Sequence, residues 1–174
     1  MKRLLAILLL SSSAQAGSVY IDQVGDSNSI YVNQYGTGDH EAIILNQGDG
    51  NQLSIIQQNG GDHSAFIGTP PSGMLGSSYV TTPGQGNSNN DLTIYQAGSG
   101  NHTAAINLDH TVANNNNTAS IDQQGSADKQ FTLNLSGSNI GVTVVQDNAT
   151  TADSGSMSIQ CYTGTCQGYS YTRH

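Results

Sequence analysis

The chain has 174 residues and a strongly polar composition, with 21 glycines, no tryptophan, two phenylalanines and only 9% charged residues. Twelve acids face four strong bases, and the formal net charge of −8 argues against nucleic acid or an anionic membrane as a partner. Such a composition cannot fill a thick globular core. The chain must therefore be disordered, or folded into a thin, repetitive structure closed by backbone and amide hydrogen bonds.

Residues 1–16 have the pattern of a secretory signal peptide. Two basic residues precede an apolar run from Leu4 to Leu10, and the segment ends in the small-residue sequence Ala14-Gln15-Ala16. The run is too short to span a bilayer, and no later stretch is long and apolar enough to do so. We therefore expect cleavage before Gly17 and a secreted protein, extracellular or at the cell surface, without membrane insertion. Cleavage would remove two of the four bases and make the formal net charge −10.

The rest of the chain repeats the pattern apolar-x-apolar-x-Gln, followed by a glycine-rich turn. In the best copy, Leu92, Ile94 and Gln96 alternate with Thr93 and Tyr95, which is the period-two signature of a short strand. The pattern occurs seven times, in copies that end in Gln23, Gln34, Gln47, Gln58, Gln96, Gln123 and Gln146. Three further segments, 104–108, 131–135 and 157–161, keep the alternation without the glutamine, which makes ten candidate strands.

The spacing of the copies indicates how they stack. The interval from Gln23 to Gln47 is nearly the same as that from Asp26 to Asp49, so alternate strands rather than neighbours are equivalent. One coil then holds two strands and two turns, and we predict an all-β fold, a two-sheet parallel β-solenoid of about five strand-turn-strand coils. The glutamines would face inward, where an unpaired amide costs about 1–3 kcal/mol. Stacked in successive coils, they can pair as an amide ladder.

The pattern divides the chain into five segments. After the signal peptide, residues 17–66 form a first block of coils and residues 91–160 a second block. Residues 67–90 hold all three prolines and form an insertion loop, which at this length is either functional or flexible. Residues 161–174 form a tail.

Cys161 and Cys166 enclose a turn-like sequence in the tail. In an exported chain with two cysteines we expect a local disulfide that makes a bridged hairpin over the last coil. A redox or metal role is the alternative, but no basic residue lies close by in sequence to activate a thiolate.

Nothing in the sequence favours catalysis. His40 and His63 lie in matching Gly-Asp-His turns one repeat apart, which would bring them together on stacking; repeated polar turn residues explain this better than a weak metal site. No phosphate loop is present, and no Ser/His/Asp arrangement can be singled out. We expect no enzyme activity, no cofactor and no metal site.

A strand, then Gln-x-Gly-x-Gly-Asn-x-x-Ala, then a second strand resembles the curlin repeat, and residues 96–104 come closest to it. The likeness covers roughly residues 18–65 and 91–146. It implies a flat solenoid whose open edges add further subunits, giving extracellular amyloid fibres used in adhesion and biofilm matrix. The partners would be copies of the chain itself or related fibre subunits. The turn residues of the repeat are Gly25, Gly36, Gly98, Gly100 and Asn101.

Three features depart from the curlin pattern: the first strand follows the cleavage site directly, the 67–90 insertion interrupts the repeat, and the tail has no counterpart. They keep an alternative open. In it the chain is a surface or virion-borne adhesin that does not polymerise, and the solenoid is a rigid scaffold for binding a glycan or cell surface.

Overall fold

The computed structural model describes residues 6–8, 17–67, 81–82, 87–109 and 112–174, and within them all regular structure is β. Among these residues, none forms a helix long and apolar enough to cross a membrane. The strands are β1 (Ala6–Leu8), β2 (Ser18–Val24), β3 (Ser29–Gly36), β4 (Glu41–Gln47), β5 (Gln52–Asn59), β6 (Ser64–Ile67), β7 (Thr81–Thr82), β8 (Asp91–Ala97), β9 (His102–Leu108), β10 (Thr118–Gln124), β11 (Lys129–Gly137), β12 (Ile140–Gln146), β13 (Asp153–Cys161) and β14 (Cys166–Arg173).

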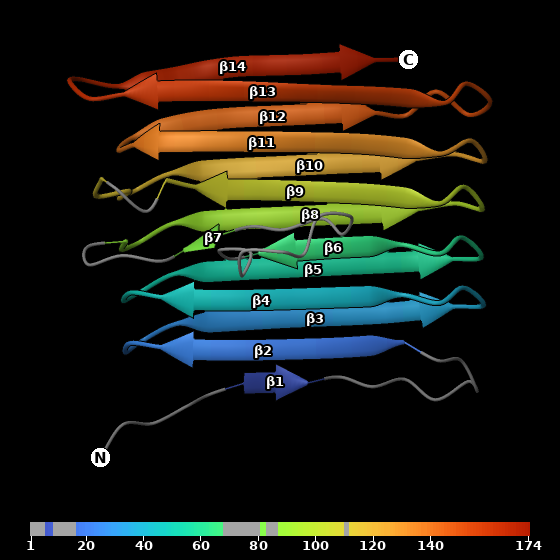
Figure 1. Cartoon of the computed structure of the whole chain (residues 1–174), viewed down its shortest axis with the longest axis horizontal. Helices are drawn as coiled ribbons and strands as arrows, with labels where there is room; N and C mark the ends of the chain where they lie inside the picture. The colour runs from blue at the N-terminus through green and yellow to red at the C-terminus, as the bar shows by residue number, and fades with distance from the viewer. Residues whose placement is uncertain (1–5, 9–16, 68–80, 83–86, 110–111) are drawn as a thin grey trace.

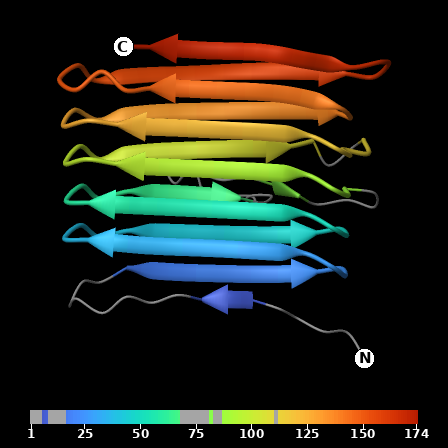
Figure 2. The same ribbon diagram turned by 180° about the vertical axis from the view of Figure 1, so that it is seen from behind.

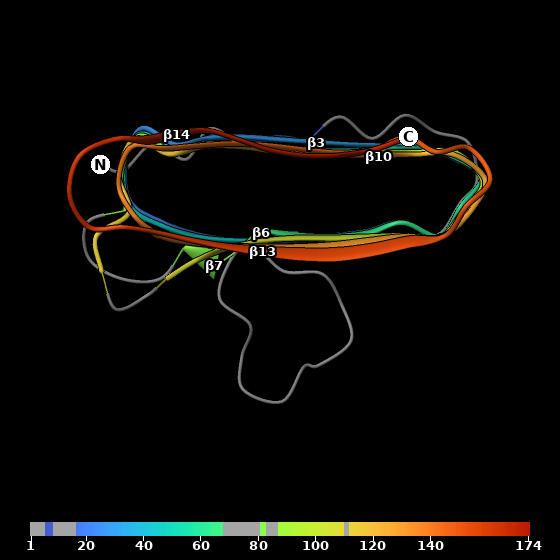
Figure 3. The same cartoon turned by 90° about the horizontal axis from the view of Figure 1, so that it is seen from above.

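The strands form two parallel sheets between which the chain alternates. Sheet A has the order β1-β3-β5-β8-β10-β12-β14, and sheet B has the order β13-β11-β9-β6-β4-β2. Each coil contributes one strand to sheet B and the next to sheet A, so the chain climbs steadily from β2 to β14 (Figures 1 and 2). Seen from above, the two sheets lie face to face across a thin interior (Figure 3). The predicted two-sheet β-solenoid is confirmed, with six coils where we expected about five.

The extra coil comes from two strands that the sequence did not predict, β6 before the insertion and β14 in the tail. β14 pairs in parallel with β12, with a register shift between Ile140 and Val142. β14 therefore extends sheet A and does not fold over the last coil as the predicted hairpin would. Cys161 and Cys166 form the predicted disulfide, which joins the end of β13 to the start of β14.

β1 lies within the predicted signal peptide and outside the six coils. Its residues pair only with β3, where Ala6, Ile7 and Leu8 lie opposite Ile30, Tyr31 and Val32. All pairings among β2 to β14 are made without it. The coils therefore do not depend on β1.

The core is a stack of aliphatic side chains between the sheets. Inner positions in successive coils hold residues of similar size, such as Ile55, Ile94 and Ile121 in sheet A, and all three are fully buried. Because each ring of side chains packs on the next, a thin interior is filled without large aromatic groups. Phe131 fills an inner position where sheet B offers space beside Gly155.

Two strands turn the opposite face inward from the one predicted. In β4 the buried residues are Ala42 and Ile44 instead of Ile43 and Leu45, and β5 is shifted in the same way. Both strands contain consecutive apolar residues, so alternation alone fits either face. A one-residue slip exchanges the two faces of a strand. The turns decide the register, because stacking equivalent turns lets the backbone N–H of Asp26 donate to Oδ1 of Asp49 at 2.7 Å.

The 67–90 insertion leaves the solenoid from sheet B. β6 has only four residues, and β7 pairs with β4 in the following positions, where Leu45 lies opposite Thr81. β8 then resumes sheet A in register with β5, since Gln52 lies opposite Asp91. The remainder of the predicted loop, 68–80 and 83–86, lies outside the described residues.

Candidate functional site

A ladder of glutamine amides runs through the inside of sheet A. In each step the Nε2 of one glutamine donates to the Oε1 of the glutamine in the next coil, at distances of 2.9, 3.1, 2.9 and 2.9 Å. All four bonds point the same way along the solenoid axis. The five rungs are Gln34, Gln57, Gln96, Gln123 and Gln146.

Each rung also ties sheet A to sheet B. The second hydrogen of the amide donates to a backbone carbonyl at the start of a sheet-B strand, as from Gln57 to Glu41 at 2.9 Å and from Gln123 to Thr103 at 3.0 Å. The four amides that are fully buried, those of Gln57, Gln96, Gln123 and Gln146, are therefore satisfied. Each such hydrogen bond contributes about 1 kcal/mol net to the free energy of unfolding, and a buried amide or carbonyl group left without its partner would cost about 1–3 kcal/mol.

Three of the seven predicted rungs lie elsewhere. Gln57, not Gln58, occupies the ladder, because register places Gln57 opposite Gln34. In sheet B, Gln23 lies opposite Asn46, and Gln47 is one position further along, opposite Val24. On its other side Asn46 lies opposite Thr82, and the later sheet-B strands carry aliphatic residues at this position, namely Leu108, Leu135 and Ile159. Gln23 is therefore not part of the sheet-A ladder, and its buried Oε1 has no hydrogen-bond partner among the described residues.

A second ladder, of asparagines, was not anticipated from the sequence. The backbone N–H of Asn51 donates to Oδ1 of Asn28 at 2.9 Å, and the same bond recurs from coil to coil up to Ile140. Each Nδ2 meanwhile donates to a backbone carbonyl of the next coil. The signal was present in the sequence, because each asparagine stands six residues before a ladder glutamine. The four are Asn28, Asn51, Asn90 and Asn117.

The turns on the other side are linked in the same manner. Here Asn101, a predicted turn residue, accepts from the N–H of Asp62 at 3.1 Å and donates its own N–H to Asp128 at 2.9 Å. Asp39 donates in turn to Asp62.

The four predicted turn glycines lie where backbone passes over backbone. A Cβ on Gly98, whose φ is +126°, would overlap the carbonyl oxygen of Gly125. Gly25 and Gly36 have similar φ values and equally close carbonyls, whereas Gly100 needs only the space. Stacking therefore requires glycine at each of these positions.

A column of histidines stands at the start of the sheet-B strands. The rings of His40 and His63 are 5.0 Å apart and those of His63 and His102 are 4.8 Å apart, all nearly parallel. Nε2 of His63 lies 2.9 Å from the carbonyl oxygen of Gln58, so this nitrogen carries the proton. Nδ1 is then a buried acceptor that has no partner in the part of the chain that the structure describes.

The geometry of the column does not suit a metal ion. The lone pairs of parallel stacked rings point in the same direction instead of converging on one point. Within the described residues, no group of three or more His, Cys, Asp or Glu is placed to hold a metal.

Burial keeps the column neutral. It lowers the pKa of His63 to about 4, against weaker opposing effects from the Gln58 carbonyl and Asp62, while the neighbouring histidines lower it further. Burial likewise lowers the pKa of His40 and of His102. The next position in the column holds Lys129, which is 1% exposed and donates to the carbonyl of Thr151.

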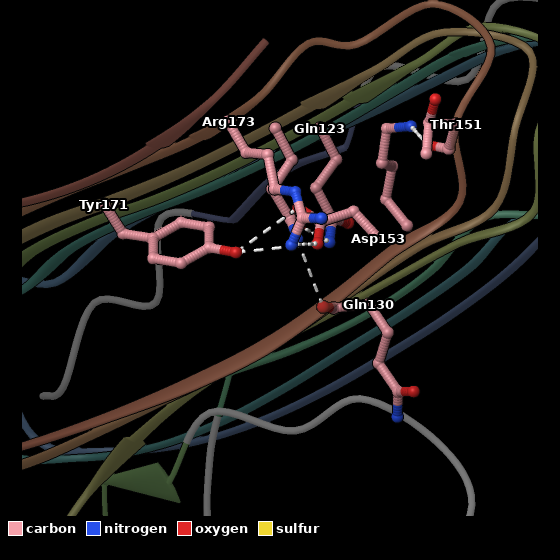
Figure 4. Close-up of polar contacts among 8 residues, drawn as sticks. Gln123, Gln130, Thr151, Asp153, Tyr171 and Arg173 are labelled. Carbon is pink, nitrogen blue, oxygen red and sulfur yellow. Dashed lines mark hydrogen bonds and ion pairs between the residues drawn. The ribbon is translucent and has the colours of Figure 1, made fainter.

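The glutamine ladder ends at a carboxylate. Gln146 donates to Oδ2 of Asp153 at 2.8 Å, and Nη1 of Arg173 lies 3.1 Å from Oδ1 of the same group. The hydroxyl of Tyr171 also donates to Asp153, at 3.4 Å (Figure 4). Asp153 belongs to sheet B and Arg173 to sheet A, so this cluster joins the two sheets at the last coil.

The described part of the surface has shallow hollows with mixed polar and apolar lining. One of 410 Å³ lies along the corner beside Asn101, Asp128 and Gln130, and another of 290 Å³ lies over sheet A near Ser120 and Thr143. The first is also lined by Lys129, Asp153 and Ser154, of which Lys129 and Asp153 are buried.

Comparisons with protein-family models, curated proteins and solved structures found no match. The likeness to curlin therefore rests on the repeat residues themselves, and the structure adds the two ladders and the two strand edges as the features from which function can be argued.

Proposed function

We propose that this chain is a structural subunit of a curli-like extracellular fibre, which grows by stacking copies edge to edge and serves adhesion and biofilm matrix. The observation that supports the proposal most is that the solenoid ends in parallel strands at both ends. β13 and β14 are the terminal strands at one end, and β2 and β3 at the other once β1 is set aside.

Such edges favour addition of further strands. An edge strand presents a row of unpaired N–H and C=O groups, and barrels or covering segments normally remove this hazard. Within the solenoid, like side chains also stack in register, as in the glutamine ladder, and such stacking stabilises amyloid. A copy added in register would lengthen both sheets and the hydrophobic stack together.

The end coils expose part of the interior. Each sheet contributes one layer of side chains to the core, so the side chains of a terminal coil have no further coil to cover them. Tyr169 of β14, which lies opposite buried Val142, is 44% exposed. Stacking a second copy would cover that surface. Export by residues 1–16 would place the fibre outside the cell, and no reaction is part of the proposed role.

Purification of the chain from Gly17 onward, followed by thioflavin binding and negative-stain microscopy, tests the proposal. Unbranched fibres that bind the dye are the expected result. A persistent monomer over a hundredfold range of concentration would overturn it and would favour the adhesin in which the solenoid is only a scaffold.

A further inference from the structure

The two ends of the glutamine ladder differ in chemistry. At the β3 end, Gln34 donates from Nε2 to Gln57 and to the carbonyl of Ser18, while its Oε1 accepts no hydrogen bond within the described residues. At the β14 end, the residue in the sixth ladder position is Arg173, which lies opposite Gln146. One end therefore offers an acceptor and the other a donor.

Arg173 has donors to spare. Its Nη1 contacts Asp153, whose side chain is 2% exposed, while the Arg173 side chain is 56% exposed. A guanidinium carries five N–H donors, so one ion pair leaves others facing outward. Of the two Lys and Arg residues in the described part of the chain, Lys129 is buried and only Arg173 is exposed.

The β3 edge accepts a parallel strand. β1 lies on it in parallel register, with Leu8 opposite Val32. If β14 of another copy took this place and continued the register of sheet A, Tyr171 would lie opposite Val32, since Tyr171 shares the inner column of Val144. Arg173 would then lie opposite Gln34.

We propose that this contact is the joint between copies: the guanidinium of Arg173 in one copy donates to Oε1 of Gln34 in the next, with β14 on β3 and β13 on β2. The inference rests on the proposed function and adds the partner surface, the register and the polarity of the fibre. Each copy contributes a donor end and an acceptor end, so the contact is heterologous and does not close on itself.

Seeded elongation of the chain from Gly17, followed by thioflavin fluorescence, tests the joint with Arg173→Glu and Gln34→Lys. In a joint between two copies of the first variant, the new carboxylate faces Oε1 of Gln34, and two acceptors repel each other. In a joint between two copies of the second, the new ammonium faces the guanidinium of Arg173, and two cations repel each other. We expect each to elongate about tenfold more slowly or worse, as for loss of a hydrogen bond to a charged group. An equimolar mixture forms native joints alternating with Glu–Lys joints, and its rate should return to within about threefold of the wild-type rate.

Thr172→Glu and Asn33→Lys are the matched controls, because they introduce the same charged side chains one position away on the outer face of the same strands. They should change the rate by less than about threefold. Circular dichroism of each monomer establishes that it is folded. If the Arg173→Glu variant unfolds because its new carboxylate lies beside Asp153, Arg173→Ala replaces it, and the mixture of Arg173→Ala with Gln34→Lys should then outgrow either protein alone.

The outcomes separate the joint from the function. Fibres from the wild-type chain, together with variants that elongate normally or a mixture that grows no faster than its parts, overturn the joint and leave the fibre standing. A wild-type chain that forms no fibres overturns both.

Discussion

Nε2 of Gln57 donates to Oε1 of Gln96 at 3.1 Å although 39 residues separate the two in the chain. The ladder therefore continues across the insertion that interrupts the repeat. β5 and β8 pair over seven consecutive residues at this point, so the insertion departs from sheet B without disturbing sheet A. In the sequence, the insertion is the feature that fits a uniform fibre least well. In the structure, it leaves sheet A continuous from β5 to β8.

Replacing this rung should be costly. Gln96→Ala removes the acceptor of Gln57 and the donor to Gln123, both in the buried interior, and we expect a loss of about 2–4 kcal/mol in the free energy of unfolding. Gln58→Ala is the control, since Gln58 lies on the outer face; it should cost less than about 1 kcal/mol. Denaturant unfolding of the two variants measures the difference, and equal losses would contradict the ladder as assigned.

Mild acid should weaken the fold through the histidine column. The pKa of His63 is about 4 in the folded chain and close to the usual 6.5 when unfolded, so the unfolded state binds more protons between these values. Stability is therefore full above pH 6.5 and falls by about 2–3 kcal/mol from His63 alone as the pH drops to 4. His40 and His102 act in the same direction.

Thermal melting between pH 4 and 7.5 measures this slope. The carboxylates of Asp39 and Asp62 lie near the column and raise the pKa of His40, and Asp62 also raises that of His63. Burial lowers both pKa values and is the larger effect, so the fold still loses stability in acid. His63→Asn should flatten the slope even if it lowers the melting temperature at neutral pH. An unchanged slope in that variant would show that other groups cause the acid sensitivity.

Lys129→Met should leave stability unchanged or raise it. The ammonium is buried and bonded to the Thr151 carbonyl, and an apolar side chain of similar size avoids the desolvation of a charge. Lys129 also lowers the pKa of His102, so the variant should raise that pKa. An NMR titration of the imidazole checks this shift, and a pKa of His102 that stays the same would contradict the contact.

Removing the disulfide should loosen β14 and slow assembly. Cys161→Ser with Cys166→Ser opens the loop that starts β14, at a cost of about 2 kcal/mol. If the hairpin were a cap, as the sequence suggested, assembly would be faster; because β14 extends sheet A, its edge is the surface that a second copy needs. Hydrogen exchange of the β14 amides measures the loosening of the strand, and seeded elongation measures the rate of assembly. Faster elongation of the variant would support the hypothesis that the hairpin caps the edge.

The presence of residues 1–16 should inhibit assembly. β1 covers Ile30 to Val32 on the edge where the proposed joint places β14. The full chain should therefore elongate several-fold more slowly than the chain from Gly17, in parallel seeded reactions. Equal rates would mean that β1 does not compete for this edge.

The sequence predicted the fold because repetition makes a weak signal strong. The alternation of Leu92, Ile94 and Gln96 is typical of many strands, but its recurrence at a nearly constant interval leaves a parallel solenoid as the arrangement that brings like residues together. The disulfide followed from two cysteines at turn spacing. The sixth coil was missed because β14 carries Tyr169, Tyr171 and Arg173 where β12 carries valines and a glutamine, and because the insertion leaves β6 only four residues long.

The register of β4 and β5 was wrong for a reason that the same sequence could have corrected. Ile55-Ile56-Gln57-Gln58 alternates equally well in two frames, and aligning on the last glutamine chose the wrong one. Asn51 stands six residues before Gln57, as Asn90 stands before Gln96. The asparagines, whose side chains fix the turns from coil to coil, define the frame where the apolar pattern does not.

The stacking of copies is tested most directly by the axial repeat of the fibre. Six coils at about 4.8 Å each give a repeat of about 29 Å per subunit, with a strong spacing between strands along the same axis. Fibre diffraction or cryo-electron microscopy of assemblies of the chain from Gly17 should show both spacings. Fibres whose inter-strand spacing lies across the axis, or whose subunit repeat differs from the length of six coils, would contradict stacking of the solenoids end to end.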